Sequence, residues 1–160
     1  MRIFFILFMA LISCKASSQS PNPPPPDQTI PAEPCPGSGD DLGGASEVLG
    51  LINYERSKRG LFGLANDPAL MCAARIHAID VAKFKVCTHT GSDFSQFWQR
   101  AKRCGGVASG EVIACGHTDA ASVVTDWTND PSHAQIIYDP KQRYIGGYRA
   151  GNYWVVIFKK

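Results

Sequence analysis

From residue 45 onward, the spacing of apolar residues predicts a series of short helices. Segment 46–60 (SEVLGLINYERSKRG) has a helical pattern. The next helix is expected to begin at Asn66 or Asp67, because Pro68 suits a first helical turn, and to run to Lys85. Its apolar residues follow at steps of three or four and should share one face: Leu70, Ala74, His77, Val81 and Phe84.

The rest of the chain predicts two more helices, a helical turn and three strands. Segment 92–104 (SDFSQFWQRAKRC) is amphipathic, and a strand is expected over 111–114. Segment 118–130 (TDAASVVTDWTND) predicts a helix, and 131–138 (PSHAQIIY) a short helical turn. The chain then predicts a β-hairpin, with strands in RYIGGYRA and YWVVIFKK around a turn at Gly151-Asn152.

The last strand is apolar on both sides. Tyr153, Val155 and Ile157 alternate with the apolar residues Trp154, Val156 and Phe158. A strand that is apolar on both faces has to be covered on both faces. We therefore expect an α/β fold in which the sheet lies between helices, as a three-layer α-β-α sandwich.

The N-terminus has the layout of a secretory signal peptide. One positive charge at Arg2 precedes a short apolar run, Ile3–Ile12, and Leu11-Ile12-Ser13-Cys14 resembles the lipobox of bacterial lipoproteins. The resemblance implies lipidation of Cys14 and a membrane anchor; the alternative is an ordinary leader and a secreted soluble protein. The predicted organisation is a leader (1–13), a Pro/Ser/Gly-rich disordered tether (14–44) and a folded domain (45–160).

Charge and cysteine content agree with an exported protein. The formal net charge is only +2, which does not resemble the basic footprint of a nucleic-acid binder. Six cysteines are many for a cytosolic chain of this size, and no CxxC spacing is present. Cys72 and Cys87 lie near opposite ends of one predicted helix, too far apart to pair. We expect a Cys104–Cys115 disulfide across a Gly-rich loop, and leave open whether Cys35 pairs with the domain.

Several ordered motifs resemble the CAP domain, the family of cysteine-rich secretory proteins, antigen 5 and plant pathogenesis-related proteins. The bacterial secreted branch, called SCP-like, is most similar. Segment 51–70 (LINYERSKRGLFGLANDPAL) resembles the family's opening Asn-x-Glu-Arg and Asp-Pro-x-Leu motifs. The other motifs are THTGSD, Gly110-Glu111, Trp127 with PSHAQII, and the closing hairpin with Gly146, Gly147 and Tyr148.

The resemblance implies an α/β/α sandwich and a shared cleft. At the family's positions, two histidines and one acid are His89, His133 and Glu111. Asp130, three residues after Trp127, matches a second acid of animal members. Two imidazoles and a carboxylate suit zinc or a similar divalent cation, so His89, His133 and Glu111 are candidate metal ligands. Without a metal, the carboxylate would orient the histidines for ligand binding or proton transfer.

The sequence therefore predicts an exported, lipid-anchored CAP domain that binds a ligand in this cleft. The ligand would be a divalent metal, a lipid or sterol, or an envelope or host component. A metal-assisted or general-base hydrolase is the alternative, and so is an interaction module with a vestigial cleft. Val112, Ser132 and Ala134 replace polar or small residues of the family pattern, and these replacements are compatible with the last interpretation. A cysteine protease using Cys87 and His89 is a further alternative.

Two histidines and the three tryptophans have structural rather than chemical interpretations. His77 lies on the apolar face of its helix and is expected to be a core histidine. His117 follows Gly116 in a loop and is expected to face solvent. The three tryptophans are expected to pack in the core rather than to line a ligand site.

Overall fold

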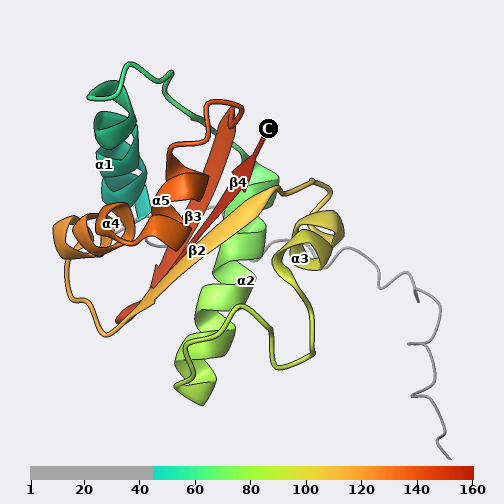
Figure 1. The fold of residues 1–160 in the computed structure, drawn as a ribbon. Helices are drawn as coiled ribbons and strands as arrows, with labels where there is room; N and C mark the ends of the chain where they lie inside the picture. Colours follow the sequence, from blue (N-terminus) through green and yellow to red (C-terminus); the bar gives the residue numbers. More distant parts are fainter. Residues whose placement is uncertain (1–44) are drawn as a thin grey trace, which may run out of the picture.

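The computed structural model describes residues 45–160, which form a four-stranded sheet between two layers of helices (Figure 1). The predictions for the leader, for Cys14 and for Cys35 lie outside the described residues. The elements in chain order are α1 (Ala45–Ser57), β1 (Ala65–Asn66), α2 (Pro68–Phe84), α3 (Phe97–Arg103), β2 (Gly110–Cys115), α4 (Ala120–Asn129), α5 (Pro131–Ile137), β3 (Tyr144–Ala150) and β4 (Tyr153–Lys159). No helix within 45–160 is long and apolar enough to cross a bilayer.

The sheet has the strand order β1-β3-β4-β2, so β2 is an edge strand. β1 runs parallel to β3, and the β3–β4 and β4–β2 pairs are antiparallel. The register places Glu111 of β2 opposite Ile157 of β4, and Cys115 opposite Tyr153. The predicted hairpin is confirmed, with Gly151 in the left-handed region at its turn.

Two hydrophobic clusters confirm the prediction of a three-layer sandwich. Alternate residues of β4, Trp154, Val156 and Phe158, pack in the cluster that also holds buried residues of α1, α4 and α5. Val155 and Ile157 pack in the other cluster, with α2 and α3. Gly146 lets α2 approach β3 closely, because a Cβ there would overlap the backbone of Leu70 and Met71.

The helix boundaries follow local chemistry with a few departures from expectation. Asp67 caps α2 by accepting hydrogen bonds from the amides of Ala69 and Leu70, as predicted. Phe84, placed by its spacing on the apolar face, is the last residue of α2 and is half exposed. Segment 92–104 is helical only over α3, and the short strand β1 was not predicted.

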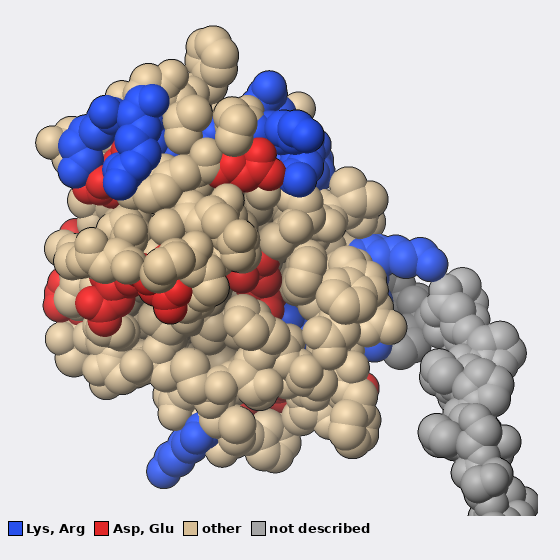
Figure 2. Space-filling view, in the orientation of Figure 1, with Lys and Arg blue, Asp and Glu red and all other residues tan. Residues whose placement is uncertain are grey.

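Charge is unevenly distributed over the surface. In Figure 2, Lys and Arg side chains gather in two groups at the end of the molecule where α1 ends and where the chain terminates. Acidic atoms are visible on the flank and near the middle of the same face. The middle of this face lies over β2, between α5 and α3, where the candidate site lies.

Candidate functional site

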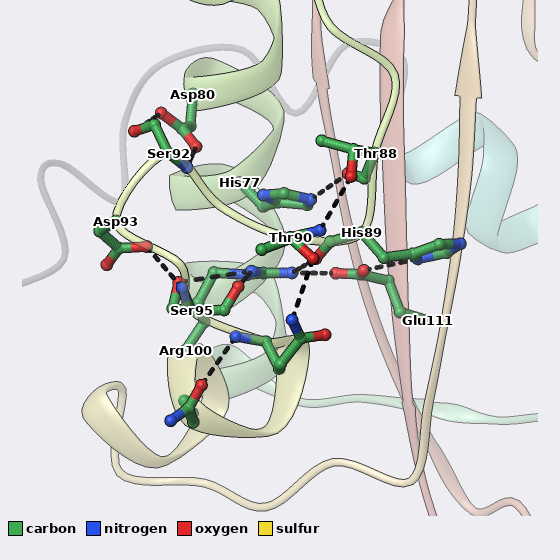
Figure 3. Close-up of polar contacts among 12 residues, drawn as sticks. His77, Asp80, Thr88, His89, Thr90, Ser92, Asp93, Ser95, Arg100 and Glu111 are labelled. Carbon is green, nitrogen blue, oxygen red and sulfur yellow. Dashed lines mark hydrogen bonds and ion pairs between the residues drawn. The ribbon is translucent and has the colours of Figure 1, made fainter. Parts of the chain in front are cut away.

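His89 lies in the segment that follows α2 and forms a direct contact with β2. Its Nδ1 is 2.9 Å from Oε1 of Glu111 (Figure 3). The His89 side chain is 53 % exposed and the Glu111 side chain 1 % exposed. The pair therefore presents a surface imidazole whose one nitrogen is held by a buried carboxylate, with Nε2 left for another partner.

Arg100 of α3 provides the counter-charge for Glu111. Its Nη2 donates to Oε2 of Glu111 at 2.7 Å, and both side chains are 1 % exposed. The same nitrogen donates to the main-chain carbonyl of His89, and Nη1 donates to the carbonyl of Ser95. A buried carboxylate requires such a partner, because an unpaired charge in the interior costs several kcal/mol. Arg100 thus fixes both the acid and the backbone of the histidine that the acid orients.

Sequence reasoning missed Arg100, although the sequence contains a signal for it. Arg100 follows Phe97 by three residues and precedes Ala101, so it lies on the apolar face of α3. A basic residue on an apolar face needs partners for its charge when it is buried, and an acid is the usual one. That partner is Glu111, eleven residues later on the neighbouring strand.

His77 supports the same segment from the core, as predicted for a buried histidine. Its side chain is fully buried, and its Nε2 lies 2.8 Å from the carbonyl oxygen of Thr88. Burial lowers the pKa of His77, while the nearby charges of Glu111 and Arg100 act in opposite directions. A neutral His77 donates from Nε2 to the carbonyl of Thr88, the residue before His89, and Arg100 donates to the carbonyl of His89 itself. Buried side chains therefore hold the main chain on both sides of His89.

A disulfide joins the His89 segment to the far end of β2. Cys87 and Cys115 are bonded, with their Cα atoms 6.1 Å apart. The prediction of a Cys104–Cys115 disulfide is therefore wrong: Cys104 is a free, half-buried thiol. The physical reason is that β2 is extended over six residues, which takes Cys115 roughly 15–20 Å from the strand's start near Cys104.

The disulfide also removes the cysteine-protease alternative. Cys87 is two residues from His89, but its sulfur is bonded to Cys115 and is no thiolate nucleophile. Burial raises the pKa of the Cys104 thiol, which leaves it mostly protonated near neutral pH.

His133 and Asp130 form a second, local pair on α5. Nδ1 of His133 is 3.3 Å from Oδ2 of Asp130, and the two side chains are 24 % and 46 % exposed. Asp130 is the N-cap of α5; hydrogen bonds from Ser132 lower the pKa of its carboxyl. The ring of His133 lies 6.5 Å from that of Trp127, whose Nε1 donates to the carbonyl of Ile113 in β2.

The four residues predicted to share a cleft therefore form two separate pairs, His89–Glu111 and His133–Asp130, on either side of β2. Within residues 45–160, neither His133 nor Asp130 makes a hydrogen bond or ion pair with His89 or Glu111. No three His, Cys, Asp or Glu side chains of this part of the chain are grouped so as to hold a metal ion. His117, expected in solvent, is three-quarters buried and pairs with Asp126.

The arrangement of Glu111 does not fit the predicted zinc ligand set. Both of its carboxylate oxygens are occupied, one by His89 and the other by Arg100. A cation on Glu111 would have to displace either the His89 ring from Oε1 or the buried Arg100 guanidinium from Oε2. In each of the two pairs the carboxylate contacts Nδ1 of the histidine. Nε2 of His89 and Nε2 of His133 have no partner among the described residues, so these two atoms are able to contact a ligand or an ion.

This fold and this His–Glu pair occur in a chain whose sequence matches a known family. The model of the cysteine-rich secretory protein family, CAP, matches residues 49–158. The chain belongs to the CAP family. The match includes His89, Glu111 and His133, so the resemblance expected from the motifs is confirmed.

Three similar proteins are bacterial. The protein YkwD of Bacillus subtilis is 31 % identical over 116 residues, which are 70 % of this chain and 45 % of that protein. An extracellular SCP-domain protein from Bacillus anthracis has a TM-score of 0.68 at 21 % identity, over 72 % of this chain and 40 % of that one. An outer surface protein of Borrelia burgdorferi has a TM-score of 0.69 at 27 % identity, over 76 % of this chain and 95 % of that one. The chain thus spans less than half of the two Bacillus proteins.

Proposed function

We propose that this CAP domain acts outside the cytoplasm, anchored through lipid on Cys14, and binds a polar ligand at Nε2 of His89. The location is supported by the apolar leader and its lipobox-like end, and by relatives whose names describe extracellular and outer-surface proteins. The Cys87–Cys115 disulfide agrees with an oxidising compartment.

The binding role depends on one observation, the His89–Glu111–Arg100 chain. The 2.9 Å contact at Nδ1 orients the ring and leaves Nε2 of a half-exposed side chain without a partner in the domain. With its Nδ1–H held by the carboxylate, the neutral imidazole can accept a hydrogen bond or a proton at Nε2, or ligate a cation there. Glu111 acts as the residue that positions His89, and Arg100 supplies the counter-charge that Glu111 needs in the interior.

His133 is the second contact in this proposal. It is also held by a carboxylate at Nδ1, and α5 packs against the start of β2, where Ile136 covers Gly110. The two free Nε2 atoms belong to histidines that flank the same edge strand. A ligand with a lipid or sterol body and a polar head, an envelope component, or a divalent cation would each offer a partner to these nitrogens.

Zn²⁺ serves as a probe of whether the two histidines form one site. The expected result of a titration followed by NMR is that the ring signals of His89 and His133 change together, with one saturation curve. His133→Ala should then weaken the response of His89, because the shared ion loses a ligand. Independent curves, and a His89 response unaffected by His133→Ala, would refute the shared site. The control is His117→Ala, since His117 follows the end of β2 opposite to Glu111 and pairs with Asp126.

A general-base hydrolase is the second candidate, and the His89–Glu111 pair is the observation that favours it. A histidine oriented by a buried carboxylate can take a proton from water. Hydrolysis of casein or of simple esters that is lost in His89→Ala and reduced in Glu111→Gln would support this activity. Activity unchanged in both variants would assign the hydrolysis to another residue or a contaminant.

A further inference from the structure

One end of the domain combines half of its cationic side chains with exposed aromatic side chains. We call it the basic end; it consists of residues 54–62, Asp67, residues 139–144 and residues 159–160. It contains seven of the domain's Lys and Arg residues and three acids, whereas the remainder of 45–160 has seven of each sign. The net positive charge of the folded domain is therefore concentrated at this end.

Contacts between distant segments build the basic end. The buried side chain of Arg56 donates to the carbonyls of Phe62, Ile137 and Asp139, which joins the loop after α1 to the loop before β3. The guanidinium of Arg59 lies 3.7 Å from the ring centroid of Tyr138. Arg143 bonds through its main chain to Lys159, and Ala65 bonds to Arg143, which adds the C-terminus and β1.

The charges of the basic end are only partly neutralised. Lys58 and Arg59 share one acid, Glu55, and both are about half exposed. Lys160 pairs with Asp139 and Lys159 with Asp67. Lys141 and Arg143 are exposed and form no ion pair within the described residues; the Arg143 guanidinium bonds only main-chain carbonyls of its own turn. Figure 2 shows the cations of this end as two groups, with protruding uncharged side chains and some acidic atoms between them.

The exposed large side chains at this end are aromatic. Phe62, in the loop after α1, is 82 % exposed, and Tyr54 and Tyr144 are 60 % and 40 % exposed. An exposed phenylalanine on an end of the domain that is rich in Lys and Arg matches the interface of a bilayer with anionic headgroups. The ring would enter the boundary of the acyl chains, while the cations contact phosphates.

We propose that the basic end docks the domain on a bilayer surface that contains anionic phospholipid, with Phe62 inserted between headgroups. The basic end shares no residue with the His89–Glu111–Arg100 chain, so the two functions are separable by mutation. The predicted anchor at Cys14 and its tether would leave the domain free to reach the membrane, because an extended segment of that length spans roughly 100 Å.

The test compares binding of the chain without its predicted leader, residues 14–160, to two kinds of vesicle, phosphatidylcholine alone and phosphatidylcholine mixed with phosphatidylglycerol. Every protein carries Cys14→Ala, so that neither the apolar leader nor an acyl chain contributes. The expected result is binding to the mixed vesicles only, abolished at about 1 M salt. The variant Lys141→Glu with Arg143→Glu should bind at least about tenfold more weakly. Phe62→Ser should weaken binding roughly fivefold without changing its salt dependence.

The matched control changes the same number of charges elsewhere. Lys83 and Lys85 lie at the other end of the molecule, at the end of α2, so Lys83→Glu with Lys85→Glu should bind like the parent (Figure 1). Unfolding curves confirm that each variant is folded. Equal binding to both vesicles, equal loss in the control, or no effect of Phe62→Ser would overturn the proposal. Binding to dextran sulfate but not to the mixed vesicles would also overturn it, since it would identify a polyanion rather than a bilayer.

Discussion

His89 and His133 are each paired with a carboxylate, but they are positioned by different physics. His89 is held by groups from three elements: the Glu111 carboxylate of β2, the Arg100 guanidinium of α3, and His77 of α2 through Thr88. His133 is held by an acid three residues earlier, at the cap of its own helix, and that pair is part exposed. One histidine depends on tertiary structure, whereas the other depends on a local helix cap.

This difference predicts how the protein responds when the residues that hold each histidine are substituted. A buried charge network fails as a unit, because removal of one member leaves another charge unpaired in the interior. An exposed pair at helical spacing is screened by water and is worth little by itself. The largest effects are therefore expected on the Glu111 side of β2, and the smallest on α5.

Arg100→Met is the substitution expected to reduce the stability of the fold most. It leaves Glu111 buried without its counter-charge, so the free energy of unfolding should fall by about 3–5 kcal/mol. Urea denaturation followed by circular dichroism measures this loss. The matched control is Arg103→Met on the same helix, which breaks only the part-exposed contact with Asp93 and should cost at most about 1 kcal/mol.

A second substitution separates lost charge from lost packing at this position. Combining Arg100→Met with Glu111→Leu removes both charges, and stability should recover most of the loss. In that double variant the ring of His89 has no acceptor at Nδ1, so its NMR signals should broaden or shift even though the fold is restored. A double variant as unstable as Arg100→Met would show that the charge pair is not the source of the cost.

Removal of the Cys87–Cys115 disulfide is expected to have the next largest effect on stability. Cys87 and Cys115 are separated by 28 residues, and removing both sulfurs should lower the free energy of unfolding by about 3 kcal/mol. The expected secondary effect is a looser segment 87–90, measured as faster amide exchange there. Amides of α5 should be unchanged, since its pair is independent of the disulfide.

Cys104→Ser provides the control for the disulfide, and it also tests the corrected pairing. Because Cys104 is free and only half buried, this change should leave the unfolding curve nearly unaltered under oxidising conditions. A stability loss in Cys104→Ser equal to that in Cys115→Ser would restore the pairing that the sequence alone predicts.

The sequence alone predicts those elements whose formation depends on neighbouring residues. The continuous apolar run 153–158 predicts a strand covered on both faces, and two clusters do cover it. The Asp67-Pro68 start of α2 was predictable for the same reason, because a cap depends only on neighbouring residues. β1 is two residues long and is defined only by its pairing with β3, so no local pattern predicts it.

The candidate site was predictable only in part. Motif order indicated His89 and Glu111, and the structure does place them in contact. The grouping of His133 with them is a statement about distances across a strand, which composition and spacing do not contain. Arg100 and the Cys87–Cys115 bond were missed because both join residues that fall on separate elements, and the loop path from α3 to β2 decides the outcome.

The smallest predicted effect concerns Ser132, and it tests whether the His133–Asp130 pair depends only on its own helix cap. Its hydroxyl and amide hydrogen bonds lower the pKa of Asp130 below the usual 3.8, so Ser132→Ala should raise that pKa toward the usual value. A depressed carboxyl pKa contributes stability that is present above pH 3.8 and is lost as the pH falls through the folded value. The variant should therefore show a weaker decline of stability in acid, measured with the NMR titration of the Asp130 carboxyl. The His89 signals should stay unchanged throughout, because no described contact connects Ser132 to Glu111; a shift of both histidines would mean that the two sides of β2 are coupled after all.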